Sequence, residues 1–250
     1  IEQVAPDVLV LTDFDYDLDG RALTAFARVT DYDHWFASRP NSGMPTGLDM
    51  DGDGYLGDGS DAQGFGRFSG DGGMAVMSKL PIGEVTDYSA TLWADLDGAI
   101  WPTTENGSFP SKAAFATQRI SSTGHWTVQI DPAGTTPFEV IAFSATPPVF
   151  DGPEDQNGLR NRDELRLASA MIGDTQGAFF IVGNANLDPA DGQGFPDAMA
   201  AVLSDPRVQD PMPASVGGLV AANPDHNGDP ALDTADWPDD GPGNLRVSYV

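Results

Sequence analysis

The sequence predicts a mixed α/β sandwich in which long loops join short elements. Short segments rich in β-branched and aromatic residues alternate irregularly with weaker helical patterns. The 29 Gly and 20 Pro among 250 residues favour long ordered loops, and 40% hydrophobic residues are enough for a core. These observations predict a single domain over residues 1–250.

Six apolar segments have the composition of strands, and most are expected to be buried on both faces. In chain order they cover residues 8–12, 73–79, 126–130, 138–146, 178–184 and 245–250. The predicted core includes Val8, Leu9, Val10, Val140, Ile141, Phe143, Phe180, Ile181 and Val182.

Four segments have helical patterns, and they cover residues 21–29, 112–119, 161–172 and 196–203. The last of them begins with Pro196, a residue that suits the first position of a helix because its missing N–H would have no partner there. We therefore expect helices between the strands.

The charge balance restricts the partners of this acidic protein. Lys and Arg number 12 against 38 Asp and Glu, a formal charge of −26, so nucleic acid is expected to bind only through a metal ion. The absence of Cys excludes thiolate ligands, and no apolar run approaches the length of a membrane span. The acidic, cysteine-free composition favours a periplasmic or secreted location.

The acidic loop 49–61 resembles the first half of an EF-hand calcium loop. The predicted ligands are Asp49, Asp51, Asp53, the Tyr55 carbonyl and, as a further ligand, Asp61. Ser60 stands where an EF-hand has its bidentate Glu. Five Asp within thirteen residues repel one another unless a cation lies among them, so we predict bound Ca²⁺. The alternative is a solvated acidic turn, which is the better interpretation of a weaker similar string at 225–229.

Polar groups follow four of the predicted strands, in segments 11–15, 142–147, 182–189 and 244–250. In order and spacing these segments resemble the endonuclease/exonuclease/phosphatase superfamily, which includes pancreatic-type deoxyribonuclease, abasic-site endonucleases and sphingomyelinases. Residues 11–13 are similar to its Leu-Gln-Glu, 183–186 to its Gly-Asp-Phe-Asn and 246–249 to its Arg-Ile-Asp-Tyr.

The resemblance implies a four-layer α/β sandwich with two mostly antiparallel sheets, here with long acidic loops. It extends over essentially the whole chain, and the first and last strands of the family would lie before Ile1 and after Val250. The activity that it implies is divalent-metal-dependent hydrolysis of a phosphodiester or phosphomonoester, with a phosphorylated small molecule or a phosphodiester as substrate.

The resemblance also assigns roles to five positions. Asp13 would bind Mg²⁺ or Mn²⁺ in the cleft, and Asn186 would contact phosphate. Three catalytic positions depart from the family pattern: Ser144 stands in place of a histidine, Asn184 in place of the water-activating aspartate, and Ser248 in place of the aspartate that orients a terminal histidine. We therefore expect a catalytically weakened or inactive protein.

Three further residues are candidates for substrate binding. His125 lies in a region that runs along the edge of the cleft in this family, although a histidine beside Trp126 is also typical of a structural residue. Arg160 and Asn161 could meet an anionic substrate, whereas Arg162 and residues 164–166 have the pattern of a charged, solvated helix face.

Two functions follow from these patterns. The first is a phosphoesterase with residual activity. The second is a non-catalytic, calcium-binding structural or assembly subunit that keeps the phosphoesterase fold and binds a protein partner at exposed sheet edges.

Overall fold

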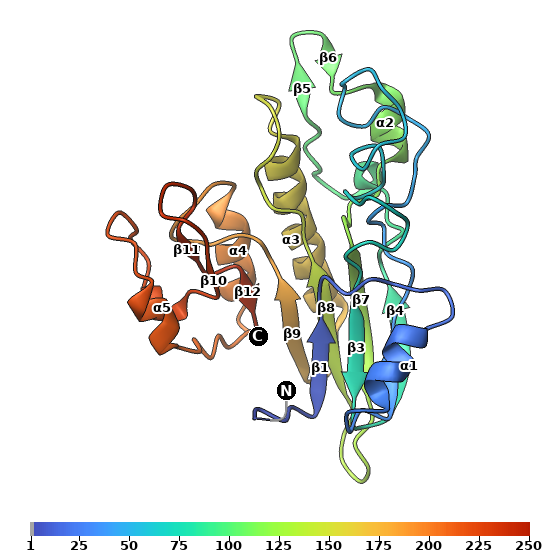
Figure 1. The fold of residues 1–250 in the computed structure, drawn as a ribbon, viewed down its shortest axis with the longest axis vertical. Coiled ribbons are helices and arrows are strands. Elements are labelled where there is room, and N and C mark those ends of the chain that lie inside the picture. Colours follow the sequence, from blue (N-terminus) through green and yellow to red (C-terminus); the bar gives the residue numbers. More distant parts are fainter. Residues whose placement is uncertain (1–2) are drawn as a thin grey trace.

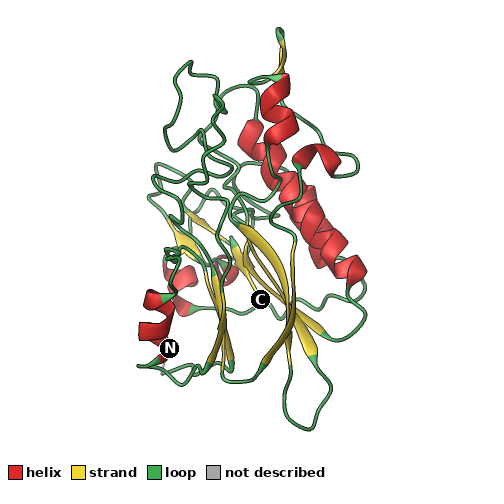
Figure 2. Ribbon diagram, turned by 90° about the vertical axis from the view of Figure 1, so that its right-hand side faces the viewer, coloured by secondary structure: helices red, strands yellow, loops and turns green. Residues whose placement is uncertain are grey.

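The chain forms two packed sheets with helices on both outer faces, in a computed structural model that describes residues 3–250. Figure 2 shows the two sheets between helix α1 (Arg21–Ala27) on one side and the long helix α3 (Gln156–Asp174) on the other. This arrangement of four layers confirms the predicted fold class.

The smaller sheet has three antiparallel strands in the order β1-β3-β2 (Figure 1). Their bounds are Val8–Leu11 for β1, His34–Phe36 for β2 and Ala75–Ser78 for β3. Leu23 of α1 packs on the outer face of this sheet, against Ala75 and Met77.

The larger sheet has five strands in the order β12-β9-β8-β7-β4, and its pairs are antiparallel except for β8 with β9. The strands are β4 (Ile82–Asp87), β7 (Gly124–Ile130), β8 (Phe138–Ser144), β9 (Phe179–Asn184) and β12 (Ser248–Tyr249). The predicted strand 245–250 is therefore interrupted. Between β11 and β12 the Val247 carbonyl accepts hydrogen bonds from the backbone N–H groups of Ala185 and Asn186, at 2.8 and 3.1 Å.

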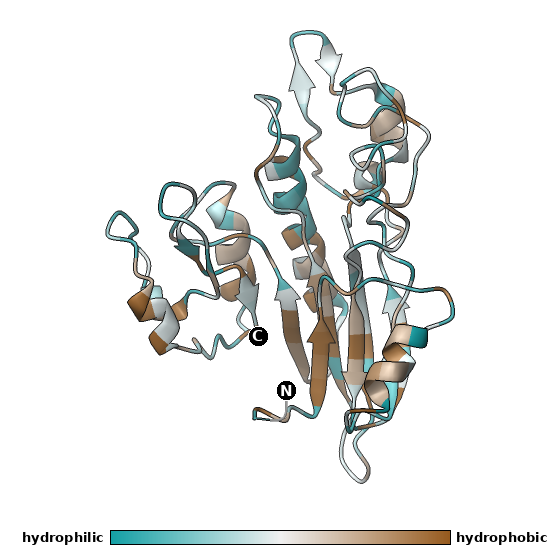
Figure 3. Cartoon of the chain, in the orientation of Figure 1, coloured by the Kyte–Doolittle hydropathy of each residue, from teal (hydrophilic) through white to brown (hydrophobic). Residues whose placement is uncertain are grey.

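Strand β8 shows how one segment serves two cores. Val140 and Ala142 face the smaller sheet, while Ile141 and Phe143 face the helices, because successive side chains of a strand point to opposite faces. Helix α4 (Pro196–Leu203) has the predicted bounds and packs beside α3 on that second face. Figure 3 shows hydrophobic residues along β1 and β9, whereas the upper half of α3 is hydrophilic.

The predicted core is correct in part. Val140, Ile141 and Phe143 are buried, whereas residues 8–10, Ile181 and Val182 are partly buried at the margins. Phe180 is an error, because 54% of its surface is exposed and its ring packs edge-on against Phe138. The smaller sheet does not cover this end of β9.

The remaining elements are short. They are helices α2 (Lys112–Thr117) and α5 (Val216–Val220), 3-10 turns at Trp93–Asp95 and Pro230–Leu232, and short strands at Thr103–Thr104 (β5), Gly107–Ser108 (β6), Ala235–Asp236 (β10) and Asn244–Leu245 (β11). Within residues 3–250, no helix is both long and apolar enough to cross a membrane.

Candidate functional site

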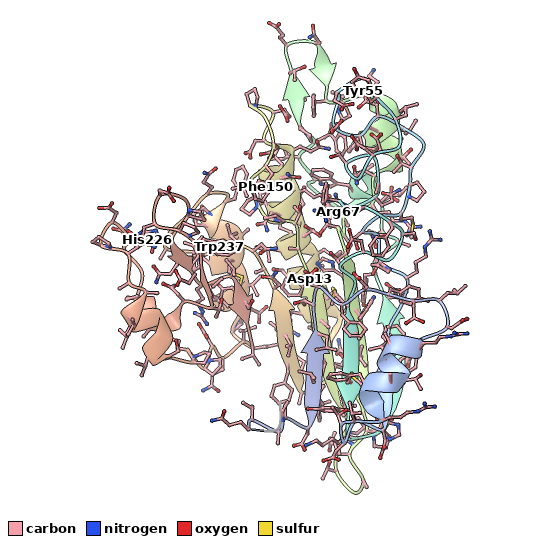
Figure 4. The ribbon with its side chains drawn as sticks, in the orientation of Figure 1. Asp13, Tyr55, Arg67, Phe150, His226 and Trp237 are labelled. Atoms are coloured by element: carbon pink, nitrogen blue, oxygen red, sulfur yellow. The ribbon has the colours of Figure 1, made fainter. Side chains whose placement is uncertain are left out.

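A cleft of about 950 Å³ lies beyond the carboxyl ends of β1, β8 and β9. The predicted site residues that line it are Asp13, Asp51, Ser144, Arg160, Asn184 and Asn186. In Figure 4, Asp13 lies above the end of β1, with Arg67 and Phe150 further toward the loops. The cleft therefore collects residues from segments that are far apart in the sequence.

Strand register brings three of the predicted catalytic positions together. Ser144 is the parallel partner of Asn184, and Ser248 is the antiparallel partner of the same Asn184. The three residues therefore occupy adjacent strands at one edge of the sheet. Ser144 and Asn184 line the cleft, whereas Ser248 is exposed beside it. The Asn184 Oδ1 atom is buried and has no hydrogen-bond partner among residues 3–250.

Asp13 and Asn186 both adopt a left-handed backbone, with φ of 56° and 50°. Asp and Asn tolerate this conformation better than other non-glycine residues do. The Asn186 amide donates to the Ala145 carbonyl at 2.8 Å, which joins the segment after β9 to the segment after β8. The exposed Asp13 carboxylate lies beside Gly72, where an added Cβ would come within 3.1 Å of Oδ1. Gly72 thus leaves room for that carboxylate.

Arg160 lines the cleft, but its guanidinium is held by the wall. Its Nε donates to the Ile120 carbonyl at 3.0 Å, and Nη2 donates to three more carbonyls, those of Gln63, Arg119 and Ser121. Burial lowers the pKa of this guanidinium, whereas the nearby charge of Glu164 raises it. The guanidinium of Arg160 therefore holds the backbone of the cleft wall in place. Its predicted contact with an anion stays a prediction.

Asn161 is fully buried on the next position of α3. Its Nδ2 donates to the carbonyls of Thr146 and Ala185, at 2.7 and 2.8 Å. The amide therefore ties together the two segments that follow β8 and β9. It does not line the cleft, so its predicted contact with substrate is indirect in this conformation.

Glu164 is buried, which corrects the expectation of a solvated helix face at this position. Its Oε1 accepts from the Ser122 N–H at 2.6 Å and from the Ser122 hydroxyl at 2.8 Å. Its Oε2 accepts from the Thr146 N–H at 2.7 Å. Burial raises the pKa of the carboxyl, and Arg160 opposes that effect. One side chain thus holds two segments of the cleft wall, one before β7 and one after β8.

His125 has no exposed surface, and it does not line the cleft. Its Nδ1 lies 2.8 Å from the Ser121 hydroxyl, and its ring stacks on Phe143 with centroids 5.3 Å apart. Burial lowers its pKa to about 3, so the ring is neutral near pH 7. This geometry corresponds to the structural alternative for His125 and offers no direct contact with a ligand in the cleft.

The acidic loop 49–61 forms one wall of the cleft through Asp51 and Ser60. The structure divides the predicted carboxylates between two groups that share Asp51, with oxygens within 4.8 Å of one another in each group. The first group is Asp49, Asp51 and Asp61, and the second is Asp51, Asp53 and Asp58, of which Asp58 was not a predicted ligand. Asp61 accepts from the backbone N–H groups of Met50 and Gly57, at 2.8 and 2.5 Å. Burial raises the pKa of Asp51, as do the charges of Asp53 and Asp58. Tyr55 is exposed near the top of Figure 4.

Four charged residues of the cleft were not predicted from the sequence, and they contribute to its charge: Arg67, Asp71, Asp151 and Glu154. Five carboxylates line it, those of Asp13, Asp51, Asp71, Asp151 and Glu154, against the two guanidinium groups of Arg67 and Arg160. Because the Arg160 group is held by carbonyls, a bound phosphate would meet net negative charge unless a cation accompanied it. No local pattern marks Arg67 or Phe65 as site residues.

The two packed sheets, the outer helices and the polar cleft at strand ends define a class of four-layer α/β proteins that place a site at one end of the sandwich. The chain belongs to the Endonuclease/Exonuclease/phosphatase family, whose sequence profile matches residues 1–250. Enzymes of this family require divalent metal ions and act on phosphodiester or phosphorylated substrates.

One of three similar solved structures supports the fold. An endonuclease/exonuclease/phosphatase from Beutenbergia cavernae DSM 12333 matches with a TM-score of 0.53 and 15% identity, over 98% of this chain and 54% of that one. The chain thus spans about half the length of that protein. A β-hairpin deletion mutant of beta toxin from Staphylococcus aureus matches with a TM-score of 0.49 and 14% identity, over 97% and 72% of the two chains.

A sphingomyelinase C from Streptomyces griseocarneus has a TM-score of 0.42 and 16% identity, over 79% of this chain and 56% of that one. A search of curated protein sequences finds no match to this chain. The first of the three structures supports the fold, and the residues of the cleft must support the function.

Proposed function

We propose that the chain binds a phosphorylated small molecule or a phosphodiester in the cleft together with a divalent metal ion, and that it hydrolyses this ligand slowly or not at all. The observation that carries the proposal is the strand register that aligns Ser144, Asn184 and Ser248 at one edge of the sheet. These are the three positions at which the chain departs from the catalytic pattern that it resembles.

The residues present fit a hard cation such as Mg²⁺ or Mn²⁺. Asp13 offers an exposed carboxylate, and Asn184 offers a buried carbonyl oxygen that lacks a partner among residues 3–250. Oxygen atoms are the ligands that these ions prefer, and an unpaired buried acceptor destabilises the protein unless something binds it. When bound, such an ion neutralises phosphate charge. Asp13 and Asn184 are therefore the residues that would hold it, and Asn186 would orient the phosphate.

The side chains at the three altered positions account for weak turnover. The Asn184 amide cannot accept a proton from water near neutral pH, as a carboxylate can. Ser144 and Ser248 supply neither an imidazole acid nor a carboxylate to orient one. Binding can therefore persist where hydrolysis fails.

The test is titration calorimetry of inorganic phosphate and dimethyl phosphate, each with and without 5 mM Mg²⁺ or Mn²⁺. We expect binding that requires the metal and that Asp13→Asn weakens at least about tenfold, since this variant removes the charged ligand. Asp19→Asn is the matched control, because Asp19 is exposed in the same loop but does not line the cleft. Equal heats with and without metal would contradict the proposal.

A second candidate function is a calcium-binding structural or assembly subunit, and the carboxylate groups of the loop 49–61 favour it. Its protein partner would pair with an exposed sheet edge, such as β4, where four of six residues are exposed. A loop with incomplete EF-hand ligands suits the weaker calcium affinities, roughly 10⁻⁴–10⁻³ M, of extracellular modules. This function goes with the proposed periplasmic or secreted location.

A further inference from the structure

Two exposed aromatic rings line the same cleft as the polar strand ends. Phe65 is 69% exposed and Phe150 is 89% exposed. Exposed phenyl groups lose no apolar contact with the core when a ligand covers them, and ligand sites commonly combine such apolar walls with a few polar groups. The cleft therefore has an apolar part that phosphate binding does not use.

The backbone holds Phe150 in an unusual conformation. Its φ of 70° lies in the left-handed region, where a bulky side chain is strained. Asn157 fixes both neighbours of Phe150: its side-chain amide donates to the Val149 carbonyl at 2.8 Å, and its backbone N–H donates to the Asp151 carboxylate. The start of α3 thus presents this ring at the cleft rather than leaving it on a loose loop.

Phe65 is held by the glycines on either side. A Cβ on Gly64 would lie 1.8 Å from the Ser122 carbonyl oxygen, and a Cβ on Gly66 would lie 2.4 Å from the Gly43 nitrogen. Both close approaches require glycine, since no side chain fits there. The backbone on both sides of Phe65 is therefore packed against other segments, and this packing fixes the position from which the phenyl ring extends.

Arg67 follows two positions later and also lines the cleft. No hydrogen bond or ion pair of its guanidinium is formed within residues 3–250, in contrast to the four carbonyls that hold Arg160. Figure 4 shows Phe150 near the top of α3 and Arg67 on the loop segment across from it. The lining of the cleft thus combines two exposed aromatic rings with a guanidinium that has no partner among residues 3–250 and can meet an anion.

We propose that Phe65 and Phe150 form a subsite for the alcohol portion of a phosphate ester, and that this portion is a flat aromatic group. The proposal rests on the proposed function, because it places the phosphate at the strand ends. Aromatic rings favour stacked or edge-on contact with another ring over contact with a flexible alkyl chain. The five carboxylates of the cleft disfavour a ligand with several phosphates, so a monophosphate ester is the class that fits.

The test compares phenyl phosphate, ethyl phosphate and inorganic phosphate by titration calorimetry in 5 mM Mg²⁺. We expect the wild type to bind phenyl phosphate about tenfold more tightly than ethyl phosphate. Phe65→Ala and Phe150→Ala should each reduce this ratio to below about threefold while leaving the affinity for inorganic phosphate unchanged. Phe150→Tyr, which keeps the ring, should retain the ratio.

Phe68→Ala is the matched control, because Phe68 is 51% exposed on the same loop but does not line the cleft. Its ratio should equal that of the wild type. If inorganic phosphate binds and the wild type binds phenyl phosphate and ethyl phosphate equally tightly, the aromatic subsite is overturned and the proposed function stands. Failure of these three ligands and of dimethyl phosphate to bind would overturn both the aromatic subsite and the proposed function.

Discussion

Asn184 lies directly opposite Ser248 in the antiparallel pair of β9 and β12, with Ser144 in register on its other side. A carboxylate at position 184 would therefore have a neighbour on each side, and the two neighbours present here carry hydroxyl groups. This arrangement makes the three positions one unit, so substitutions at them are expected to be strongly non-additive.

The first prediction concerns hydrolysis. The variant Ser144→His, Asn184→Asp, Ser248→Asp restores an imidazole and two carboxylates at adjacent positions. We expect it to hydrolyse bis(4-nitrophenyl) phosphate with Mn²⁺ at least about a thousandfold faster than the wild type, which is the scale of losing general acid–base groups. Initial rates at one metal concentration measure this. Wild-type turnover within tenfold of the variant would show that other residues perform the chemistry.

The second prediction concerns Ca²⁺ and the loop 49–61. Ligands that bind only the folded state stabilise it by mass action, so 5 mM Ca²⁺ should raise the melting temperature of the wild type. Asp61→Asn should abolish this rise, because Asp61 belongs to one of the two carboxylate groups and joins both ends of the loop. Differential scanning calorimetry with and without Ca²⁺ measures both effects.

Asp225→Asn is the control for that experiment, since Asp225 lies in the other Asp-rich string and is exposed. It should keep the full response to Ca²⁺. An unchanged melting temperature of the wild type in millimolar Ca²⁺ would identify the loop as a solvated turn.

The third prediction concerns Glu164 of α3, whose carboxylate accepts hydrogen bonds from Ser122 and Thr146. Glu164→Gln places an NH₂ group opposite a backbone N–H, at Ser122 or at Thr146, and so loses at least one hydrogen bond at a fully buried position. We expect a loss of about 2 kcal/mol in the free energy of unfolding, measured with urea. Glu84→Gln on the exposed face of β4 is the matched control and should change stability by less than about 0.5 kcal/mol. An equal loss of stability in the two variants would contradict this role of the Glu164 hydrogen bonds.

The fourth prediction concerns acid stability near the C-terminus. Burial and the nearby Asp188 charge raise the pKa of Asp233 from 3.8 to about 6, with Asp191 and Asp229 adding to this and His226 opposing it. The folded state then holds a proton that the unfolded state releases, so this group reduces stability as pH rises from about 4 to about 6.

Asp233→Asn removes that titration. We expect its melting temperature, relative to the wild type, to increase between pH 4 and pH 6 and to level off above pH 6. The variant keeps a side-chain oxygen that can accept the hydrogen bond from Asn244. Melting curves of the two proteins that run parallel through this range would show that the Asp233 carboxyl titrates normally.

Local sequence was sufficient for the main elements because their signals are short-range. The apolar, β-branched and aromatic run at 138–146 and the Pro at position 196 act within a few residues. Helix α4 has the predicted bounds, and β8 begins where predicted and ends two residues early, at Ser144. The resemblance assigned Ser144 and Asn184 to one site, and the parallel register of β8 with β9 places them side by side at the ends of neighbouring strands.

Only the tertiary structure decided which charged and aromatic side chains line the cleft or hold its walls. Glu164 has the local pattern of a solvated helix position, yet it is buried because Ser122 and Thr146 supply its hydrogen bonds from 42 and 18 residues away. Phe65 and Phe150 are ordinary apolar residues in sequence, and only the packing of Gly64 and the amide of Asn157 present them on two separate segments that line one cleft. Sequence determines local periodicity, whereas the partners that satisfy a buried charge or position an exposed ring come from segments that meet only when the chain is folded.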